Sequence, residues 1–156
     1  MLAQILDIRN YVFSVYSLPL FLASIATTAM GAYVLFKIHA SHHGFKFFLF
    51  TSCLTLWYGS FGMACATTDA QVALWWFKLG DIGVILIPVT NFSFISAITL
   101  REKKHRRLIN GAYFIAFLFI LSVLFSGLLC KGVKSFFWGY YVSYGPLGIP
   151  LVFFSS

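Results

Sequence analysis

Acidic and charged residues are scarce in this chain of 156 residues. Only four are Asp or Glu, and charged residues of both signs make up 10% of the sequence, against roughly 25% in an average soluble domain. Hydrophobic residues make up 60% of the chain and aromatic residues 20%. This composition excludes an ordinary soluble domain and is typical of a membrane protein.

Patterns typical of enzymes and metal sites are also missing. The three cysteines follow neither a metal-ligand spacing nor a framework of pairs. The sequence has no glycine-rich phosphate loop, no zinc-type helix motif and no Ser, His and acid set. His39, His42 and His43 lie together in HASHH, but no Cys, Asp or Glu accompanies them. We therefore expect no catalysis, no metal and no cofactor in this chain.

The sequence contains four long runs of residues without Asp, Glu, Lys or Arg. A helix crossing the ~30 Å hydrocarbon core needs about 20 such residues, and the runs lack the polar alternation of barrel strands. We expect an all-α, polytopic transmembrane bundle, with residues 1–156 forming a single membrane domain. The predicted spans are residues 12–37, 46–68, 72–100 and 107–130.

The last residues, 146–156, read PLGIPLVFFSS and predict the beginning of a fifth span. Eleven residues form a helix of about 16 Å, or half a bilayer. A helix that stopped at this depth would leave backbone groups unpaired in lipid. We therefore expect the chain to be a fragment of a larger protein.

The basic residues predict the orientation in the membrane. Seven of them belong to the connections after the first and third runs, where the second cluster reads REKKHRR, and only Arg9, Lys131 and Lys134 lie on the opposite side. By the positive-inside rule the N-terminus is extracytoplasmic. The first ten residues lack the basic region of a cleavable signal, so we expect the first span to be retained. The net charge of +7 follows from this topology and does not indicate nucleic-acid binding.

Aromatic and small residues carry a resemblance to a known family. They occur in LTLWYGSFGMACATTDAQVALWWFKLGDIGVILIPVTNFSF, residues 54–94, and in FFWGYYVSYGP, residues 136–146. Their order resembles the N-terminal seven-transmembrane sensor region of bacterial histidine kinases, which also precedes diguanylate cyclase domains. The matching positions are Trp57, Trp76, Lys78, Leu79, Gly83, Pro88, Trp138, Gly139, Tyr140, Tyr144, Gly145 and Pro146.

The resemblance implies a multi-pass signal-input domain of the bacterial inner membrane. Its partners would be the lipid bilayer, a stimulus of unknown chemistry and a cytoplasmic kinase or cyclase domain that this chain lacks, and a homodimer is compatible with it. An alternative from a different class is a small polytopic transporter or channel subunit, because a proline and polar groups within a span also mark transport pathways.

Three groups of residues are candidates for function. Five aromatic residues predicted near the outer interface are candidates for a ligand pocket or for an aromatic belt: Trp75, Trp76, Trp138, Tyr140 and Tyr144. Lys78 and Asp81 are three residues apart and predict an interfacial ion pair. Pro88 and Asn91 lie near the middle of the third span, where they suit either signal transmission or helix packing.

Overall fold

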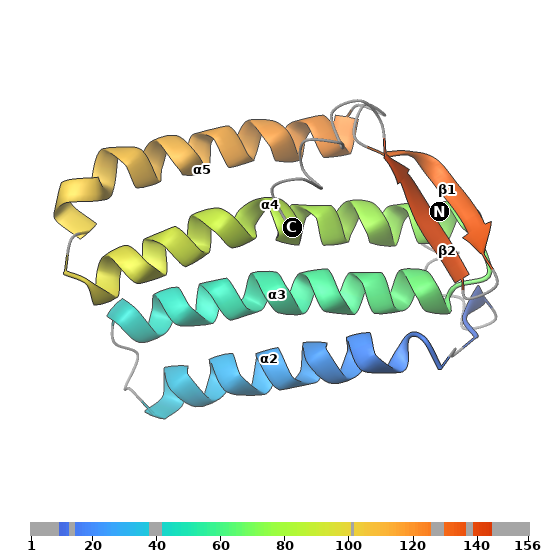
Figure 1. Ribbon diagram of the computed structural model, residues 1–156, viewed down its shortest axis with the longest axis horizontal. Helices are drawn as coiled ribbons and strands as arrows, with labels where there is room; N and C mark the ends of the chain where they lie inside the picture. Colours follow the sequence, from blue (N-terminus) through green and yellow to red (C-terminus); the bar gives the residue numbers. More distant parts are fainter. Residues whose placement is uncertain are drawn as a thin grey trace.

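Four long helices make up most of the part of the chain that the structure describes. The computed structural model describes residues 10–12, 15–37, 42–100, 102–125, 130–136 and 139–144. Each of the four helices is long and apolar enough to cross a membrane, and they lie side by side in chain order (Figure 1). The predicted four-span helix bundle is confirmed, whereas the expected fifth span, residues 146–156, lies outside the described residues. The helices are α2 (Leu18–Lys37), α3 (His42–Ala66), α4 (Ala70–Ile98) and α5 (Glu102–Phe125).

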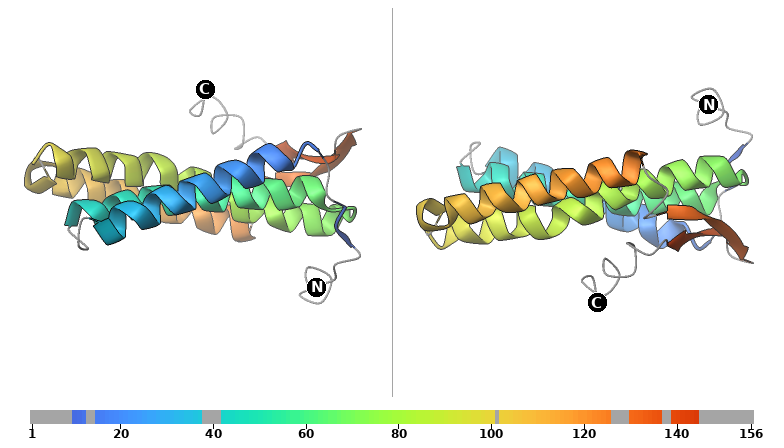
Figure 2. Two further views of the ribbon diagram at one scale, coloured as in Figure 1. Left: turned by 90° about the horizontal axis from the view of Figure 1, so that it is seen from below. Right: turned by 90° about the horizontal axis from the view of Figure 1, so that it is seen from above.

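A β-hairpin lies at one end of the helices, against α3 and α4 (Figures 1 and 2). Its antiparallel strands are β1 (Cys130–Phe136) and β2 (Gly139–Tyr144), with Ser135 opposite Tyr140. The sequence analysis predicted that the fourth span continues to Cys130, and that boundary is wrong, because Cys130 begins a strand. Val, Tyr and Phe are favoured in strands, and pairing satisfies the backbone groups that face the partner strand.

The helix ends also differ from the predicted ones for local reasons. Helix α2 begins at Leu18 rather than at residue 12, and Pro19 occupies its first turn, where a missing N–H costs nothing. Helix α5 begins at Glu102 and includes the basic stretch before the apolar run. Helix α4 ends at Ile98, because Leu100 adopts a left-handed backbone conformation with φ of 56°.

Glycine allows α3 and α4 to approach each other closely. A Cβ atom on Gly83 would lie 2.8 Å from the carbonyl oxygen of Cys53, which belongs to the backbone of α3. Near the hairpin, the rings of Phe61 and Phe77 pack edge to face with centroids 4.9 Å apart, and Phe77 is fully buried. Close backbone contact at small residues is how helices associate in lipid, where no hydrophobic force drives them together.

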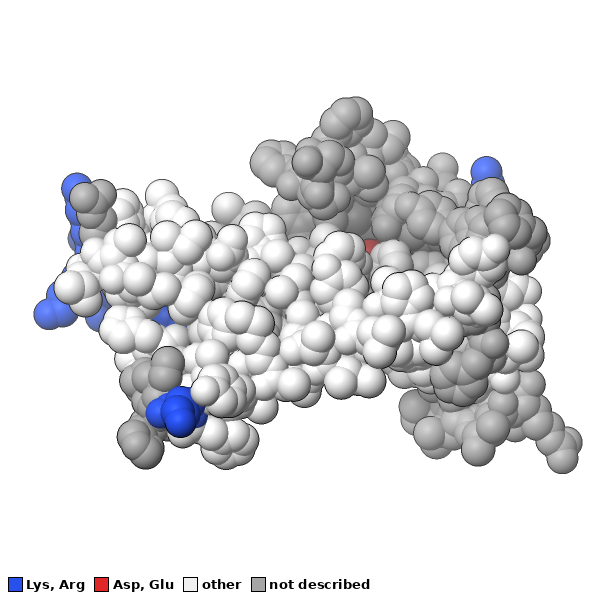
Figure 3. All heavy atoms as spheres, turned by 60° about the horizontal axis from the view of Figure 1, so that its bottom comes forward, with Lys and Arg blue, Asp and Glu red and all other residues white. Residues whose placement is uncertain are grey.

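The outer helices of the row expose apolar side chains. On α2, Leu22 and Ile25 are 66% and 65% exposed, and on α5 Phe114 is 63% exposed. Most basic residues gather instead at one end of the molecule, around the end of α2 and the start of α5 (Figure 3). We call this the basic end and the opposite one the hairpin end. An apolar belt with charges at its end is the surface expected of a protein in a bilayer.

Candidate functional site

Three segments that are distant in the sequence meet at the hairpin end around Thr68. The amide of Thr68 donates a hydrogen bond to the carbonyl oxygen of Asn10 (2.8 Å). The carbonyl oxygen of Thr68 accepts one from the phenol of Tyr140 in β2 (3.0 Å). We define the hairpin junction as Asn10–Val12, the α3–α4 turn Thr67–Asp69, and Tyr140. One turn thus binds both the segment before α2 and the hairpin after α5.

Further hydrogen bonds hold the segment before α2 to the end of α3, to the α3–α4 turn and to α4. The amide of Val12 donates to the carbonyl oxygen of Ala66 (2.6 Å), and the hydroxyl of Thr67 donates to that of Asn10 (2.9 Å). The indole N–H of Trp76, on the first turns of α4, donates to the phenol oxygen of Tyr11 (3.0 Å). The N-terminal segment therefore contacts both helices of the α3–α4 pair.

Asp69 fixes the beginning of α4 beside the junction. Its carboxylate accepts hydrogen bonds from the amides of Gln71 (2.7 Å) and Val72 (3.3 Å). These amides have no partner within the helix, so an acidic cap satisfies them and complements the positive end of the helix dipole. The cap sets where the following turn presents Trp75 and Trp76.

The five aromatic candidates are placed as follows. Tyr140 belongs to the hairpin junction, and Trp76 contacts the junction through Tyr11. Both side chains pack against the buried cluster that contains Phe77. Trp75 is 38% exposed on the neighbouring face of α4. Trp138 lies outside the described residues, and Tyr144 is described only as the last residue of β2. The ligand pocket remains a prediction.

Lys78 and Asp81 lie in different surroundings. The ammonium of Lys78 lies 5.5 Å from the centroid of the Trp75 ring, a cation–π contact. Asp81 is only 3% exposed, and within the described part of the chain no ion pair joins it to Lys78. The predicted interfacial pair is thus replaced by a cation–π contact and a buried carboxylate.

Pro88 and Asn91 lie on α4, which continues through the proline without a break. The axis of α4 bends between its ends (Figure 1), and a proline, which lacks the N–H of a helical bond, is a common cause of a bend. Asn91 is half-buried and follows the buried Thr90, whose hydroxyl donates to the carbonyl oxygen of Leu86 (2.8 Å).

Tyr11 and Thr68 were not among the residues predicted from the sequence. The only local signal was the short polar stretch Thr67–Thr68–Asp69 between two apolar runs, which indicates a turn with a helix cap. Nothing in the sequence near Tyr11 indicates that its phenol would meet an indole 65 residues later.

The four apolar helices of the described residues, their exposed apolar faces and the basic end define a multi-pass membrane protein. The family model described as the N-terminal 7TM region of histidine kinase matches residues 19–153, and the chain belongs to this family. Comparisons with curated proteins and with solved structures gave no match. The family recognised from the aromatic and small residues is therefore confirmed.

Proposed function

We propose that this chain is the signal-input domain of a bacterial signal-transduction protein. The observation that carries the proposal is the family match over residues 19–153. The family is described as a seven-transmembrane region, and in this proposal a cytoplasmic output domain belongs to a further part of the protein. Kinase or cyclase activity would then reside there, and the helices of this chain would carry the signal.

The protein is proposed to lie in the bacterial inner membrane. In the proposed orientation the hairpin end faces the outside and the basic end faces the cytoplasm. The distribution of Lys and Arg supports it, because exposed Lys37, Lys103, Lys104, Arg106 and Arg107 gather at the basic end. A stimulus outside would then meet the hairpin junction first.

The hairpin junction is the proposed input element. A ligand could move the hairpin, and so could a change in the membrane. Either movement would act on Thr68, which accepts a hydrogen bond from Tyr140 and lies between α3 and α4. Trp75, Trp76, Trp138, Tyr140 and Tyr144 are the proposed ligand-facing aromatics. Helix shifts of an ångström or two would pass inward along α4, with Pro88 and Asn91 as the proposed transmission element.

The alternative, a transporter or channel subunit, is supported by polar groups on the buried face of α4. Thr90, Ser93 and Ser96 are each less than 5% exposed, and buried polar groups within spans also line transport pathways. None of the three is acidic and able to couple to protons, and the buried carboxylate of α4, Asp81, lies nearer the hairpin end.

The reading frame beyond residue 156 and the activity of its product separate these two functions. A signal-input domain predicts further spans followed by a kinase or cyclase, and a full-length product in lipid nanodiscs that phosphorylates itself from ATP or forms a cyclic dinucleotide. A reading frame without an output domain, together with solute flux into proteoliposomes, would instead select the transporter.

A further inference from the structure

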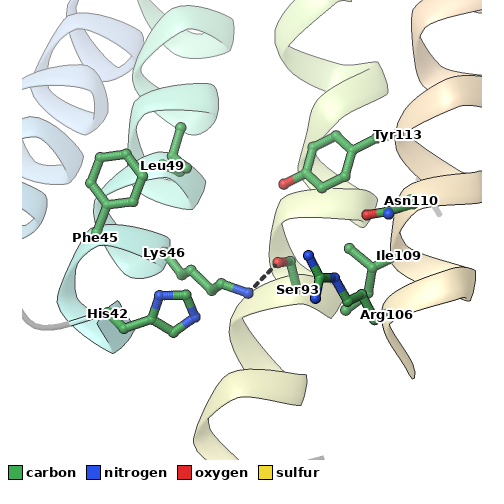
Figure 4. A pocket seen from close by; sticks show the side chains of 9 residues that line it. All are labelled: His42, Phe45, Lys46, Leu49, Ser93, Arg106, Ile109, Asn110 and Tyr113. Carbon is green, nitrogen blue, oxygen red and sulfur yellow. Dashed lines mark hydrogen bonds between the residues drawn. The ribbon is translucent and has the colours of Figure 1, made fainter. Parts of the chain in front are cut away.

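A cleft of about 350 Å³ opens at the basic end between α3 and α5, with α4 as its floor (Figure 4). It belongs to neither the hairpin junction nor the Pro88 region. Its walls combine cationic, hydrogen-bonding and apolar side chains, and none of the lining residues that the structure describes is acidic. The residues that line it are His42, Phe45, Lys46, Leu49, Ser93, Arg106, Ile109, Asn110 and Tyr113.

Two cations from different helices converge on this cleft. Lys46 extends from α3, and its ammonium donates a hydrogen bond to the hydroxyl of Ser93 on α4 (3.0 Å). Arg106 extends from α5 toward the same space (Figure 4). Two positive charges that converge on one cleft favour an anion, and a guanidinium binds phosphate oxygens in a bidentate manner.

The depth of the cations matches the headgroup region of a bilayer. Lys46 and Arg106 each lie four residues after the first residue of their helix, His42 and Glu102, which is about 6 Å along the axis. Both helices begin at the basic end. The two charges are therefore just inside the membrane surface, where lipid phosphates lie.

The deeper part of the cleft is suited to the rest of a lipid. Phe45 and Leu49 on α3 are 52% and 38% exposed and form an apolar wall that an acyl chain can follow. The phenol of Tyr113 and the amide of Asn110 point into the cleft from α5 (Figure 4), where they can donate to the ester oxygens of a glycerol backbone.

We propose that this cleft binds one anionic phospholipid, with the lipid phosphate between Lys46 and Arg106 and an acyl chain along Phe45 and Leu49. A free phosphate would use the two charges alone and leave the apolar wall without an occupant, which is why the lipid is favoured. The site joins α3 to α5 across α4, so a bound lipid fixes the spacing of these helices at the basic end.

The test measures lipid retention by the full chain. The protein is equilibrated with equal amounts of phosphatidylglycerol and phosphatidylcholine, and retained lipid is counted by native mass spectrometry. The wild type is expected to retain phosphatidylglycerol preferentially. Arg106→Gln is expected to lower that preference about fivefold, since one basic residue near a charged surface contributes about 1 kcal/mol. Lys46→Gln is expected to lower it similarly, and Lys46→Arg to preserve it.

Lys103→Gln and Lys104→Gln provide the matched control, because both residues are exposed on the first turn of α5 and neither lines the cleft. The control pair is expected to keep the preference. An equal loss in the control would assign binding to surface charge and overturn the proposal. So would a wild type without preference, as expected if another span of the protein fills the cleft. Displacement of the lipid by inorganic phosphate at matched concentration would show a phosphate site rather than a lipid site, and would also contradict it.

Discussion

Tyr140 and Thr68 are 72 residues apart in the sequence, and the phenol of the first donates a 3.0 Å hydrogen bond to the carbonyl oxygen of the second. This contact joins the hairpin to the turn between α3 and α4. The same residue, Thr68, holds the segment before α2 through Asn10. The hairpin end is therefore one connected unit, so displacement of the hairpin would also displace the adjoining ends of α3 and α4.

Replacing Tyr140 by Phe is expected to loosen the hairpin. The substitution keeps the ring and removes the O–H, and one net hydrogen bond is worth about 1 kcal/mol. Amides of β1 and β2 should then exchange with deuterium about fivefold faster. Tyr33→Phe, at a 64% exposed position on α2, is the control. Equal protection of the hairpin in both variants would show that the phenol contributes nothing to its stability.

Removing the cap at Asp69 is expected to destabilise the start of α4. Asp69→Ala leaves the amides of Gln71 and Val72 without their carboxylate partner, a loss of roughly 0.5–2 kcal/mol. Asp69→Asn should be nearly neutral, because Asn caps helices about as well as Asp. Thermal unfolding in detergent measures both variants. A melting temperature for Asp69→Ala as high as that of Asp69→Asn would contradict the role of the cap.

Adding a methyl group at Gly83 is expected to separate α3 from α4. The new Cβ would meet the backbone carbonyl of Cys53 at 2.8 Å, and backbone cannot move aside, so a cost of about 1–3 kcal/mol is expected. Gly111→Ala is the control, since nothing lies within 4 Å of its Cβ position and alanine favours a helix by about 1 kcal/mol. The melting temperature should therefore fall in Gly83→Ala and rise in Gly111→Ala. A shift in the same direction in both variants would be inconsistent with close packing at Gly83.

The proposed orientation can be tested by labelling cysteines from outside the cell. Single cysteines at Gln4 and His42 lie before α2 and at the start of α3. Cysteine 4 is expected to react with a membrane-impermeant maleimide in intact cells, and cysteine 42 only after the cells are broken. The reverse pattern would place the basic end outside and refute the orientation.

The helices could be predicted from the sequence because the bilayer imposes a length and a composition on every span. The charge-free run that includes Leu22 and Ile25 needs no knowledge of its neighbours to be recognised as a helix. The family could be predicted as well, because small and aromatic residues such as Gly83 and Trp76 follow one another along the chain in the order that the family shows.

The hairpin and the cleft could not be predicted, because both depend on contacts between distant segments. A strand pairs through its backbone, so the aromatic stretch around Tyr140 is equally suited to an interfacial turn. Lys46 and Arg106 were recognised only as charges that set the orientation. Their convergence on one cleft follows from the packing of three helices, which no local pattern encodes.

The output activity of the full-length protein tests most directly whether the hairpin junction is a signal input. Self-phosphorylation, or cyclic dinucleotide formation, is measured in lipid nanodiscs for Tyr140→Phe and for the control Tyr33→Phe, each at normal membrane insertion. A two-state input biased by one hydrogen bond of about 1 kcal/mol predicts an output changed about fivefold in Tyr140→Phe and unchanged in Tyr33→Phe. An unchanged output in Tyr140→Phe, with hydrogen exchange showing that the hairpin has loosened, would contradict the proposed function of the junction.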